Sequence, residues 1–167
     1  EEAKGLVDGR APGNIDPQAR MLAAALESAF TENYRGPLHL IGHSLGSQLI
    51  IVTALTMAQH LPWVDLIPQT QLSLLDTPDS GIGIGDINDN IKDLRDKEVY
   101  IDSYFGCTNL GPHNANVWVD VPCVSFDLCL LKLCHKVTTD WYQGTISSMK
   151  EPILKRQASC LSDTIFG

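Results

Sequence analysis

The sequence predicts an α/β fold in which a mostly parallel sheet is flanked by helices. Three features carry this prediction: short apolar runs suited to buried strands, longer segments with apolar residues at helical spacing, and Gly/Pro-rich turns between them. Strand-like and helix-like segments alternate along the chain, as is typical of a parallel sheet with helices on its faces. At 167 residues, the chain is expected to form a single domain, residues 1–167, with a sizeable core.

The first part of the chain reads as helix, strand and helix. Asp16 and Pro17 are the residue types preferred at a helix N-cap and first helical position, and apolar residues follow at helical spacing. A Gly-Pro pair ends this segment, and the apolar run 38–41 is suited to a buried parallel strand. Residues 45–60 are apolar nearly all round, which predicts a buried helix.

The rest of the chain continues the alternation with shorter elements. They are predicted, in chain order, as a strand at 72–75, a Gly/Asp/Asn-rich loop at 76–97, a strand at 99–101, a last strand within 117–133 (where 117–119 and 128–133 compete) and a closing helix at 140–149.

The composition narrows the class of function. A hydrophobic content of 44% and a charged content of 19% are those of an ordinary soluble globular protein. No apolar stretch approaches the roughly 18 residues of a membrane span. The net charge of −8 argues against nucleic-acid binding, because contacts to a phosphate backbone need clustered Lys and Arg. We therefore expect no nucleic-acid partner and no transmembrane segment.

The cysteines give a weaker indication of compartment. All five lie in the last part of the chain, without a CxxC pair or a zinc-like His/Cys spacing, so no structural zinc is expected. Two disulfides with one free thiol would suit a secreted or extracellular protein, which is the favoured reading, whereas five thiols would suit a cytoplasmic one. Because the chain starts at Glu1 without an initiator Met, we expect a processed chain or a fragment.

Residues 42–46, Gly-His-Ser-Leu-Gly, match the G-x-S-x-G pattern of a nucleophile elbow, with a predicted strand before it and a predicted helix after it. Such a turn holds Ser44 at its apex in a strained backbone conformation, so that the hydroxyl projects clear of the sheet. We expect strand and helix to approach so closely that Gly42 and Gly46 must lack a Cβ. The amide of Leu45 is expected to donate to an oxyanion.

Residues 40–46 resemble the nucleophile segment of the lipase branch of the α/β-hydrolases, notably pancreatic-type lipases and their bacterial relatives. Residues 74–78, Leu-Leu-Asp-Thr-Pro, resemble the segment in which that branch places its triad acid at a strand end, although Thr77 separates the Asp from the Pro. His135, followed by Trp141-Tyr142 and Thr145-Ile146, resembles the segment that carries the triad histidine.

The resemblance implies an α/β-hydrolase-like sheet whose early strands are missing. Only 43 residues precede Ser44, whereas the family places several strands before the nucleophile strand. The loop that supplies a second oxyanion donor would be missing with them. We therefore expect a C-terminal fragment, a second chain that supplies the missing strands, or a reduced version of the fold.

The catalytic base is expected among the histidines that follow the acid. An elbow serine needs a base, usually histidine, that a carboxylate orients. The chain order in α/β-hydrolases is serine, acid, histidine, and only His113 and His135 come late enough. His135 follows the last plausible strand and precedes a helix, where a loop-borne base is required. It is the predicted base, with His113 as the alternative.

Three aspartates compete for the acid. Asp76 ends an apolar run, so its carboxylate would lie at the carboxyl edge of the sheet, where catalytic groups gather. Asp102 ends the following predicted strand, and Asp79 lies in a turn three residues after Asp76. The family resemblance favours Asp76.

The sequence thus predicts a serine esterase or lipase that cleaves carboxylic esters with a hydrophobic acyl group, through Ser44, His135 and Asp76, with the Leu45 amide at the oxyanion. This chemistry requires no metal and no organic cofactor, so neither is expected. Thioesterases and acyltransferases use the same triad. Outside catalysis, the alternatives are a lipase-like protein that binds lipid or a partner, and an inactive fragment of a multi-chain hydrolase.

Overall fold

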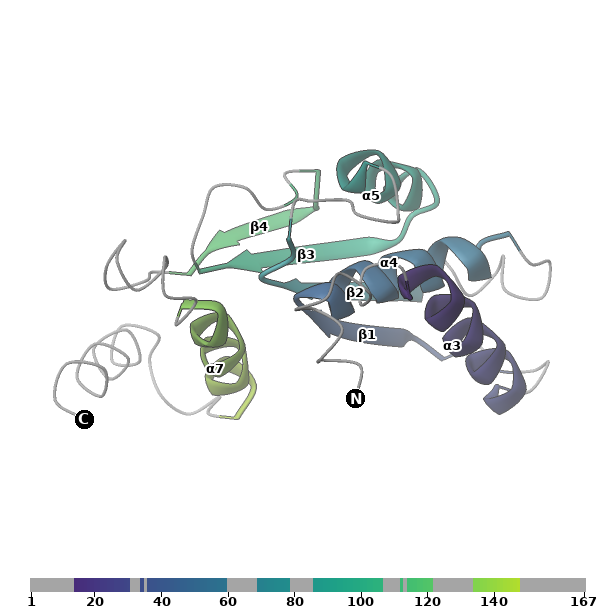
Figure 1. Ribbon diagram of the computed structural model, residues 1–167, viewed down its shortest axis with the longest axis horizontal. Helices are drawn as coiled ribbons and strands as arrows, with labels where there is room; N and C mark the ends of the chain where they lie inside the picture. Colours follow the sequence, from purple (N-terminus) through teal and green to yellow (C-terminus); the bar gives the residue numbers. More distant parts are fainter. Residues whose placement is uncertain are drawn as a thin grey trace, which may run out of the picture.

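The computed structural model describes residues 14–30, 34, 36–59, 69–78, 86–106, 112, 114–121 and 134–147, the last segment with side chains from residue 137 onward. Within these residues, a parallel sheet is flanked by helices, which confirms the predicted fold class (Figure 1).

The described sheet has four strands in the spatial order β1-β2-β3-β4, and every neighbouring pair is parallel. The strands are β1 (Leu38–His43), β2 (Thr70–Leu75), β3 (Tyr100–Phe105) and β4 (Val117–Asp120). The strand order equals the chain order, so each connection steps one strand further across the sheet. All four carboxyl ends therefore lie at the same edge.

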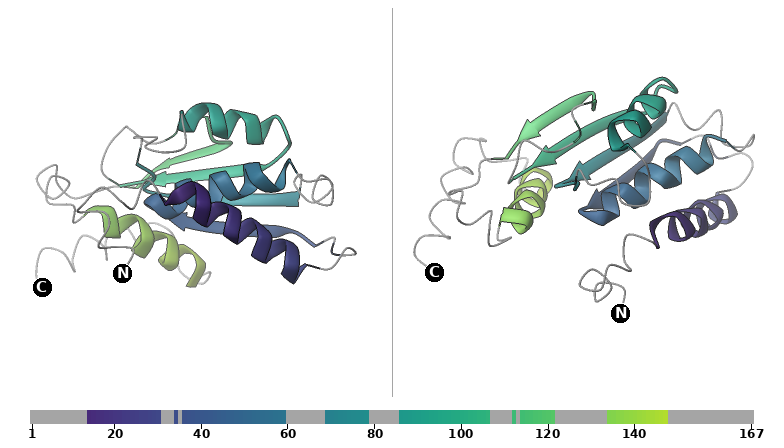
Figure 2. Two further views of the ribbon diagram at one scale, coloured as in Figure 1. Left: turned by 45° about the vertical axis from the view of Figure 1, so that its right-hand side comes forward. Right: turned by 45° about the horizontal axis from the view of Figure 1, so that its top comes forward.

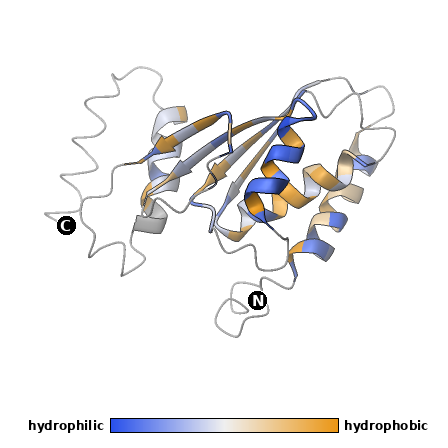
Figure 3. Cartoon of the chain, turned by 90° about the horizontal axis from the view of Figure 1, so that it is seen from above, coloured by the Kyte–Doolittle hydropathy of each residue, from blue (hydrophilic) through white to orange (hydrophobic). Residues whose placement is uncertain are grey.

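Three helices cover one face of the sheet. They are α3 (Ile15–Ala29), α4 (Leu45–Met57) and α5 (Ile87–Arg95), of which α4 and α5 connect β1 to β2 and β2 to β3 (Figure 2). Helix α4 contacts β1, β2, α3 and α5. It is the helix that the sequence predicts as apolar nearly all round, and Figure 3 colours it mainly as hydrophobic, whereas α3 and α5 each carry a hydrophilic side.

The main core lies between this helical layer and the sheet. Its strand residues alternate along the chain, as Leu72 and Leu74 do in β2, because every second side chain points to the same face. The buried members from helices and strands are Ala23, Leu38, Ile50, Ile51, Ala54, Met57, Leu72, Leu74, Ile87, Ile91, Leu94, Val99 and Ile101.

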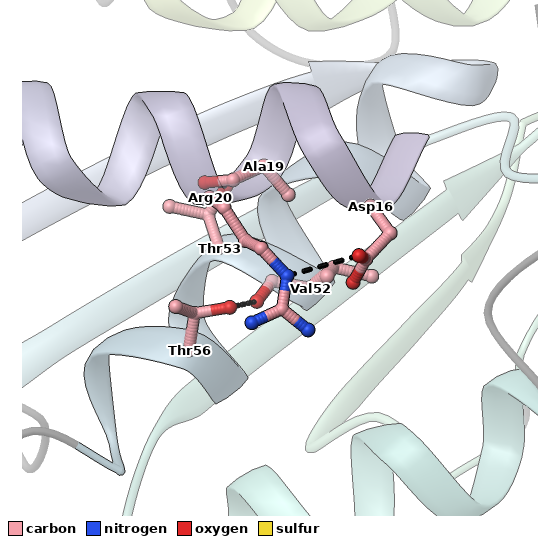
Figure 4. Close-up of polar contacts among 6 residues, drawn as sticks. All are labelled: Asp16, Ala19, Arg20, Val52, Thr53 and Thr56. Carbon is pink, nitrogen blue, oxygen red and sulfur yellow. Dashed lines mark hydrogen bonds and ion pairs between the residues drawn. The ribbon is translucent and has the colours of Figure 1, made fainter. Parts of the chain in front are cut away.

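Helix α3 packs against α4 through apolar residues, among them Ile15 and Val52, and through the Thr53 hydroxyl. Thr53 is fully buried, and its Oγ1 lies 2.8 Å from the Leu49 carbonyl oxygen and 3.3 Å from that of Ala19 on α3. Figure 4 draws Thr53 and Ala19 beside the exposed Arg20–Asp16 pair, in which Nε and Oδ2 are 2.9 Å apart. The exposed pair contributes little, because surface ion pairs are screened by water.

Helix α7 (Cys134–Ser147) packs against the opposite face. The ring centroids of Tyr142 in α7 and Tyr104 are 5.3 Å apart, and the Tyr142 hydroxyl donates to Ser73 Oγ at 3.1 Å. Ser73 alternates with the core residues Leu72 and Leu74, so its side chain faces away from α4. The sheet therefore lies between two helical layers.

The element boundaries correct several predictions. Helix α5 lies inside the segment predicted as a loop; Asp86 caps it by accepting from the Asn88 and Asp89 amides, and the buried Ile87, Ile91 and Leu94 recur at helical spacing. Strand β3 runs to Phe105 rather than ending near residue 101.

The structure confirms one candidate for the last strand and corrects the start of the closing helix. Strand β4 confirms the first of the two candidates for the last strand, and the second, 128–133, lies outside the described residues. Helix α7 begins six residues earlier than predicted. The cluster Val137-Thr138-Thr139 lowers helix propensity, but neither Gly nor Pro occurs in the added residues 134–139. Among the described helices, none has the length and apolar character that crossing a membrane demands.

Candidate active site

Ser44 lies at the apex of a turn between β1 and α4. The strand ends at His43, the helix begins at Leu45, and Ser44 is the N-cap residue, with φ 57° and ψ −127°. A positive φ is costly for a residue with a Cβ and persists only where the surroundings enforce it. The Ser44 side chain makes no capping hydrogen bond to α4. This is the strained strand-to-helix turn that the sequence pattern predicts.

Hydrogen bonds from the neighbouring strand hold the turn in place. The Ser44 amide donates to the carbonyl oxygen of Leu75, the last residue of β2, at 2.8 Å. Ser47 Oγ donates to the Gly42 carbonyl oxygen at 2.7 Å and lies 3.4 Å from that of Leu75. The Ser47 side chain is fully buried, so these polar contacts are shielded from water.

The two glycines of the motif differ in their surroundings. A Cβ on Gly42 would lie 2.4 Å from the carbonyl oxygen of Gly46 and 2.7 Å from Ser47 Cα, closer than atoms can approach. A Cβ on Gly46 would meet no atom of the described residues within 4 Å. The steric prediction is confirmed for Gly42 and is wrong for Gly46 within the described part of the chain, because the close contact involves the Gly46 backbone and not its missing side chain.

Asp76 follows β2 directly and lies at the same edge of the sheet as Ser44. His43 and Leu75 are register partners on adjacent strands, which lie about 4.8 Å apart, and Ser44 and Asp76 are the residues that follow them. The Asp76 amide donates to the Tyr104 carbonyl oxygen at 2.7 Å, and its Oδ1 lies 3.4 Å from the Gly106 amide. The structure thus brings two of the three predicted catalytic residues to adjacent strand ends.

Backbone strain coincides with these two residues. Among the described non-glycine residues, three have positive φ: Ser44, Asp76 at 49° and Glu98 at 66°. Glu98 lies in the turn between α5 and the start of β3, at the opposite edge of the sheet from Ser44 and Asp76. Strained conformations cluster at functional sites, since they persist only when surrounding contacts over-determine them.

Asp102, the alternative candidate for the acid, does not lie at the carboxyl edge of the sheet. It is the third residue of β3, not its end, and it is register-paired with Ser73 of β2. Three residues separate it from the end of the strand, which places it about 10 Å from the carboxyl edge. The expectation that Asp102 ends a strand is wrong, because β3 continues through Ser103, Tyr104 and Phe105.

Both carboxylate oxygens of Asp102 accept hydrogen bonds in a buried network. Ser73 Oγ donates to Oδ1 at 2.7 Å, and the Tyr104 hydroxyl donates to Oδ2 at 2.8 Å. His39 Nε2 lies 2.8 Å from Ser73 Oγ, and Tyr142 joins from α7. The single Ser73 proton goes to Asp102, so His39 Nε2 must be the donor in its contact with Ser73.

The sequence reasoning missed this network. Its only signal in the sequence is a polar residue at a core-like position in each of two apolar runs, Ser73 and Asp102. Burial, followed by the hydrogen bond to Asp102 and its negative charge, raises the pKa of Tyr104 above the ordinary value. The network spans three strands and α7, and it anchors that helix on the sheet.

His135 is the second residue of α7, seven residues before the anchored Tyr142. The prediction that it lies in a loop before a helix is therefore wrong. Its side chain is outside the described part, as are His113 and Asp79 as a whole. The structure places the backbone of His135 on a helix that packs against the sheet, and its role as the base stays a prediction.

The Leu45 amide occupies the first position of α4. The first four amides of a helix have no intrahelical acceptor, and the helix dipole adds positive potential there. This amide directly follows Ser44, as expected for an oxyanion donor. Within the described residues, no cluster of three or more His, Cys, Asp or Glu side chains is arranged to hold a metal ion.

The described structure is a member of the α/β class, with a serine-bearing strand-to-helix turn at the carboxyl edge of a parallel sheet. No protein-family model matches the chain, and no curated protein or solved structure is similar to it at a significant level.

The contrast between the two glycines predicts opposite effects on stability. Gly42→Ala should lower the free energy of unfolding by about 2 kcal/mol or more, because the added methyl collides with backbone that cannot move without opening the turn. Gly46→Ala should leave it unchanged or raise it by about 0.5 kcal/mol, because alanine favours the helix. Urea denaturation followed by circular dichroism measures both, and equal destabilisation would contradict the close approach described at Gly42.

The raised pKa of Tyr104 predicts a loss of stability in alkali. Folding favours the neutral phenol, so the stabilisation is complete below the unfolded-state value of about 10 and is lost as the pH rises above it. Urea denaturation at pH 8 and pH 11 should therefore show a smaller loss of stability with pH for Tyr104→Phe than for wild type. An equal loss in the two proteins would contradict the buried hydrogen bond to Asp102.

Proposed function

We propose that this protein is a serine hydrolase of carboxylic esters, an esterase or lipase acting on hydrophobic acyl esters. The observation that carries the proposal is the conformation of Ser44: φ is 57° at the apex between a parallel strand and a buried helix, beside the strand end that bears Asp76. The Ser44 hydroxyl makes no capping hydrogen bond to the helix, so capping does not explain the strained serine at this position.

The proposed reaction proceeds through an acyl-enzyme. Ser44 Oγ attacks the ester carbonyl carbon as its proton passes to the imidazole of His135, and Asp76 orients and stabilises the imidazolium. The tetrahedral oxyanion accepts a hydrogen bond from the Leu45 amide, and one such donor is worth about 10²- to 10³-fold in rate. The imidazolium returns its proton to the departing alcohol, and water then hydrolyses the acyl-enzyme by the same steps.

The edge position of β1 supports a second element of the proposal. Strand β1 is an outer strand of the described sheet, yet its sequence is that of an inner one: Leu38 and Leu40 pack on the core, and Ile41 on the other face is 49% exposed. Apolar outer strands without lysine or proline are open to further pairing. We propose that additional strands, from a second chain or from another part of a longer one, pair with β1.

Such strands would also supply what the proposed site lacks. The described residues offer one backbone oxyanion donor, Leu45, whereas acyl transfer usually employs two. The edge of β1 therefore favours a second candidate function. In it, this chain is one part of a multi-chain hydrolase and is inactive until the additional strands pair with β1.

A fluorophosphonate probe tests the proposed nucleophile. Intact mass spectrometry before and after treatment should show one phosphonyl adduct on the wild-type chain and none on Ser44→Ala, because only an activated serine reacts. A folded wild-type protein without an adduct would overturn autonomous catalysis. An adduct retained in Ser44→Ala would place the reactive group elsewhere.

The same reaction, followed as a rate, separates the candidate acid and base. Asp76→Asn and His135→Ala should each slow labelling by about 10³-fold or more, the size of effect known for triad members. His113→Ala is the control and should label at a rate close to wild type. Asp102→Asn should slow labelling less than Asp76→Asn, because it alters only the hydrogen bonds that anchor α7 and, with it, His135. A larger loss of rate in a folded Asp102→Asn than in Asp76→Asn would reassign the acid.

A further inference from the structure

Gln48 is a fully buried amide at the first turn of α4, on the side of the candidate acid. It follows Ser44 by four residues, about one helical turn. Its Nε2 donates to the carbonyl oxygen of Pro78 at 3.1 Å. Pro78 is the second residue after Asp76, so this hydrogen bond joins the helix that begins at the nucleophile to the segment that begins at the acid.

Packing alone does not account for a glutamine at this position. Helix α4 is otherwise apolar over most of its buried surface, and an apolar side chain of similar size would be favoured there. Burial of an amide is costly unless it is hydrogen-bonded, and the net gain from one such bond is small. The hydrogen bond from the amide is directional, so it fixes the Pro78 carbonyl at one distance and angle from α4.

In the segment after β2, the Asp76 amide donates to the Tyr104 carbonyl oxygen at 2.7 Å, and Gln48 adds an attachment two residues further on, at Pro78. Pro78 has no amide hydrogen, and the Thr77 hydroxyl, although buried, makes no hydrogen bond within the described residues. On the other side of Asp76, the Leu75 carbonyl is already held by the Ser44 amide at 2.8 Å. Asp76 itself has a positive φ of 49°, which persists only if its flanks are held.

We infer that Gln48 is a positioning residue for the catalytic carboxylate: its hydrogen bond to Pro78 fixes the segment that carries Asp76 relative to Ser44. This inference rests on the proposed hydrolase function. The carboxylate of a triad must orient the imidazole closely, and a displacement of about 1 Å can cost about 10²-fold in rate. Gln48 acts through Asp76 and not on the reacting atoms.

The test compares Gln48→Met with Thr53→Val in the full chain. Gln48→Met keeps the length of the side chain and removes the donor. Thr53→Val removes an equally buried polar group from the same helix, but on the side that faces Ala19 of α3. The rate of fluorophosphonate labelling is measured from pH 5 to 9, with circular dichroism to confirm folding.

Gln48→Met should label about 10- to 100-fold more slowly than wild type. Its labelling midpoint should also move about one pH unit lower, because a displaced carboxylate stabilises the imidazolium less. Thr53→Val should keep both the rate and the midpoint. A folded Gln48→Met that is less stable but keeps the wild-type midpoint would show a merely structural role for Gln48 and overturn the inference.

A second variant, Gln48→Glu, keeps the inference falsifiable if Gln48→Met unfolds. Burial raises the pKa of its carboxyl, so the protonated side chain can still donate to Pro78 at low pH. Relative to wild type at the same pH, labelling should be near normal in acid and fall as this carboxyl ionises. A constant ratio across the pH range would overturn the inference.

The outcomes also separate the inference from the proposed function. Absence of labelling at Ser44 in the wild-type protein overturns both. Labelling of wild type together with an unchanged rate and midpoint in Gln48→Met overturns the positioning role alone and leaves the hydrolase proposal in place.

Discussion

The close approach of β1 to the first turn of α4 is the constraint on which the rest of the structure depends. A methyl group at Gly42 would lie 2.4 Å from the Gly46 carbonyl oxygen, so the strand and helix backbones are in direct contact. The chain must therefore reverse direction within one residue, and Ser44 takes up the reversal with φ 57°. The same turn directs α4 back along the sheet, where Ile51 and its neighbours form the core with β1 and β2.

The strain at this turn is maintained by the parallel sheet beside it. The Ser44 amide donates to Leu75 at the end of β2, and the Asp76 amide donates to Tyr104 of β3 in the same way. Each strand end is thus held by the next strand across the sheet. Positive φ values at two adjacent strand ends cost free energy, which hydrogen bonds and the packing of α4 offset. The polar groups of the candidate site are thereby fixed on rigid elements before any substrate binds.

The two faces of the sheet are stabilised by different interactions. The face under α4 is apolar, and its stabilisation scales with buried area, which tolerates small shifts. On the other face, Asp102, Ser73, Tyr104 and Tyr142 are joined by hydrogen bonds between 2.7 and 3.1 Å. Hydrogen bonds are directional, so this face sets the position of α7 more sharply than apolar packing would. The helix that carries His135 is attached on this directional face.

The sequence by itself determined the fold class, the strand and helix around Ser44 and the place of Asp76 at a strand end, because these depend on local patterning, Gly42 and the end of an apolar run. It did not reveal α5, whose polar surface hides three core residues, or the early start of α7, where β-branched residues resemble a strand. Only the tertiary structure showed that Asp102 lies in mid-strand, that Gly46 has open space among the described residues, and that Gln48 reaches Pro78. The surroundings of Asp102 and the contact of Gln48 with Pro78 depend on which segments, about 30 residues apart in the chain, lie side by side. Sequence periodicity carries no information about that arrangement.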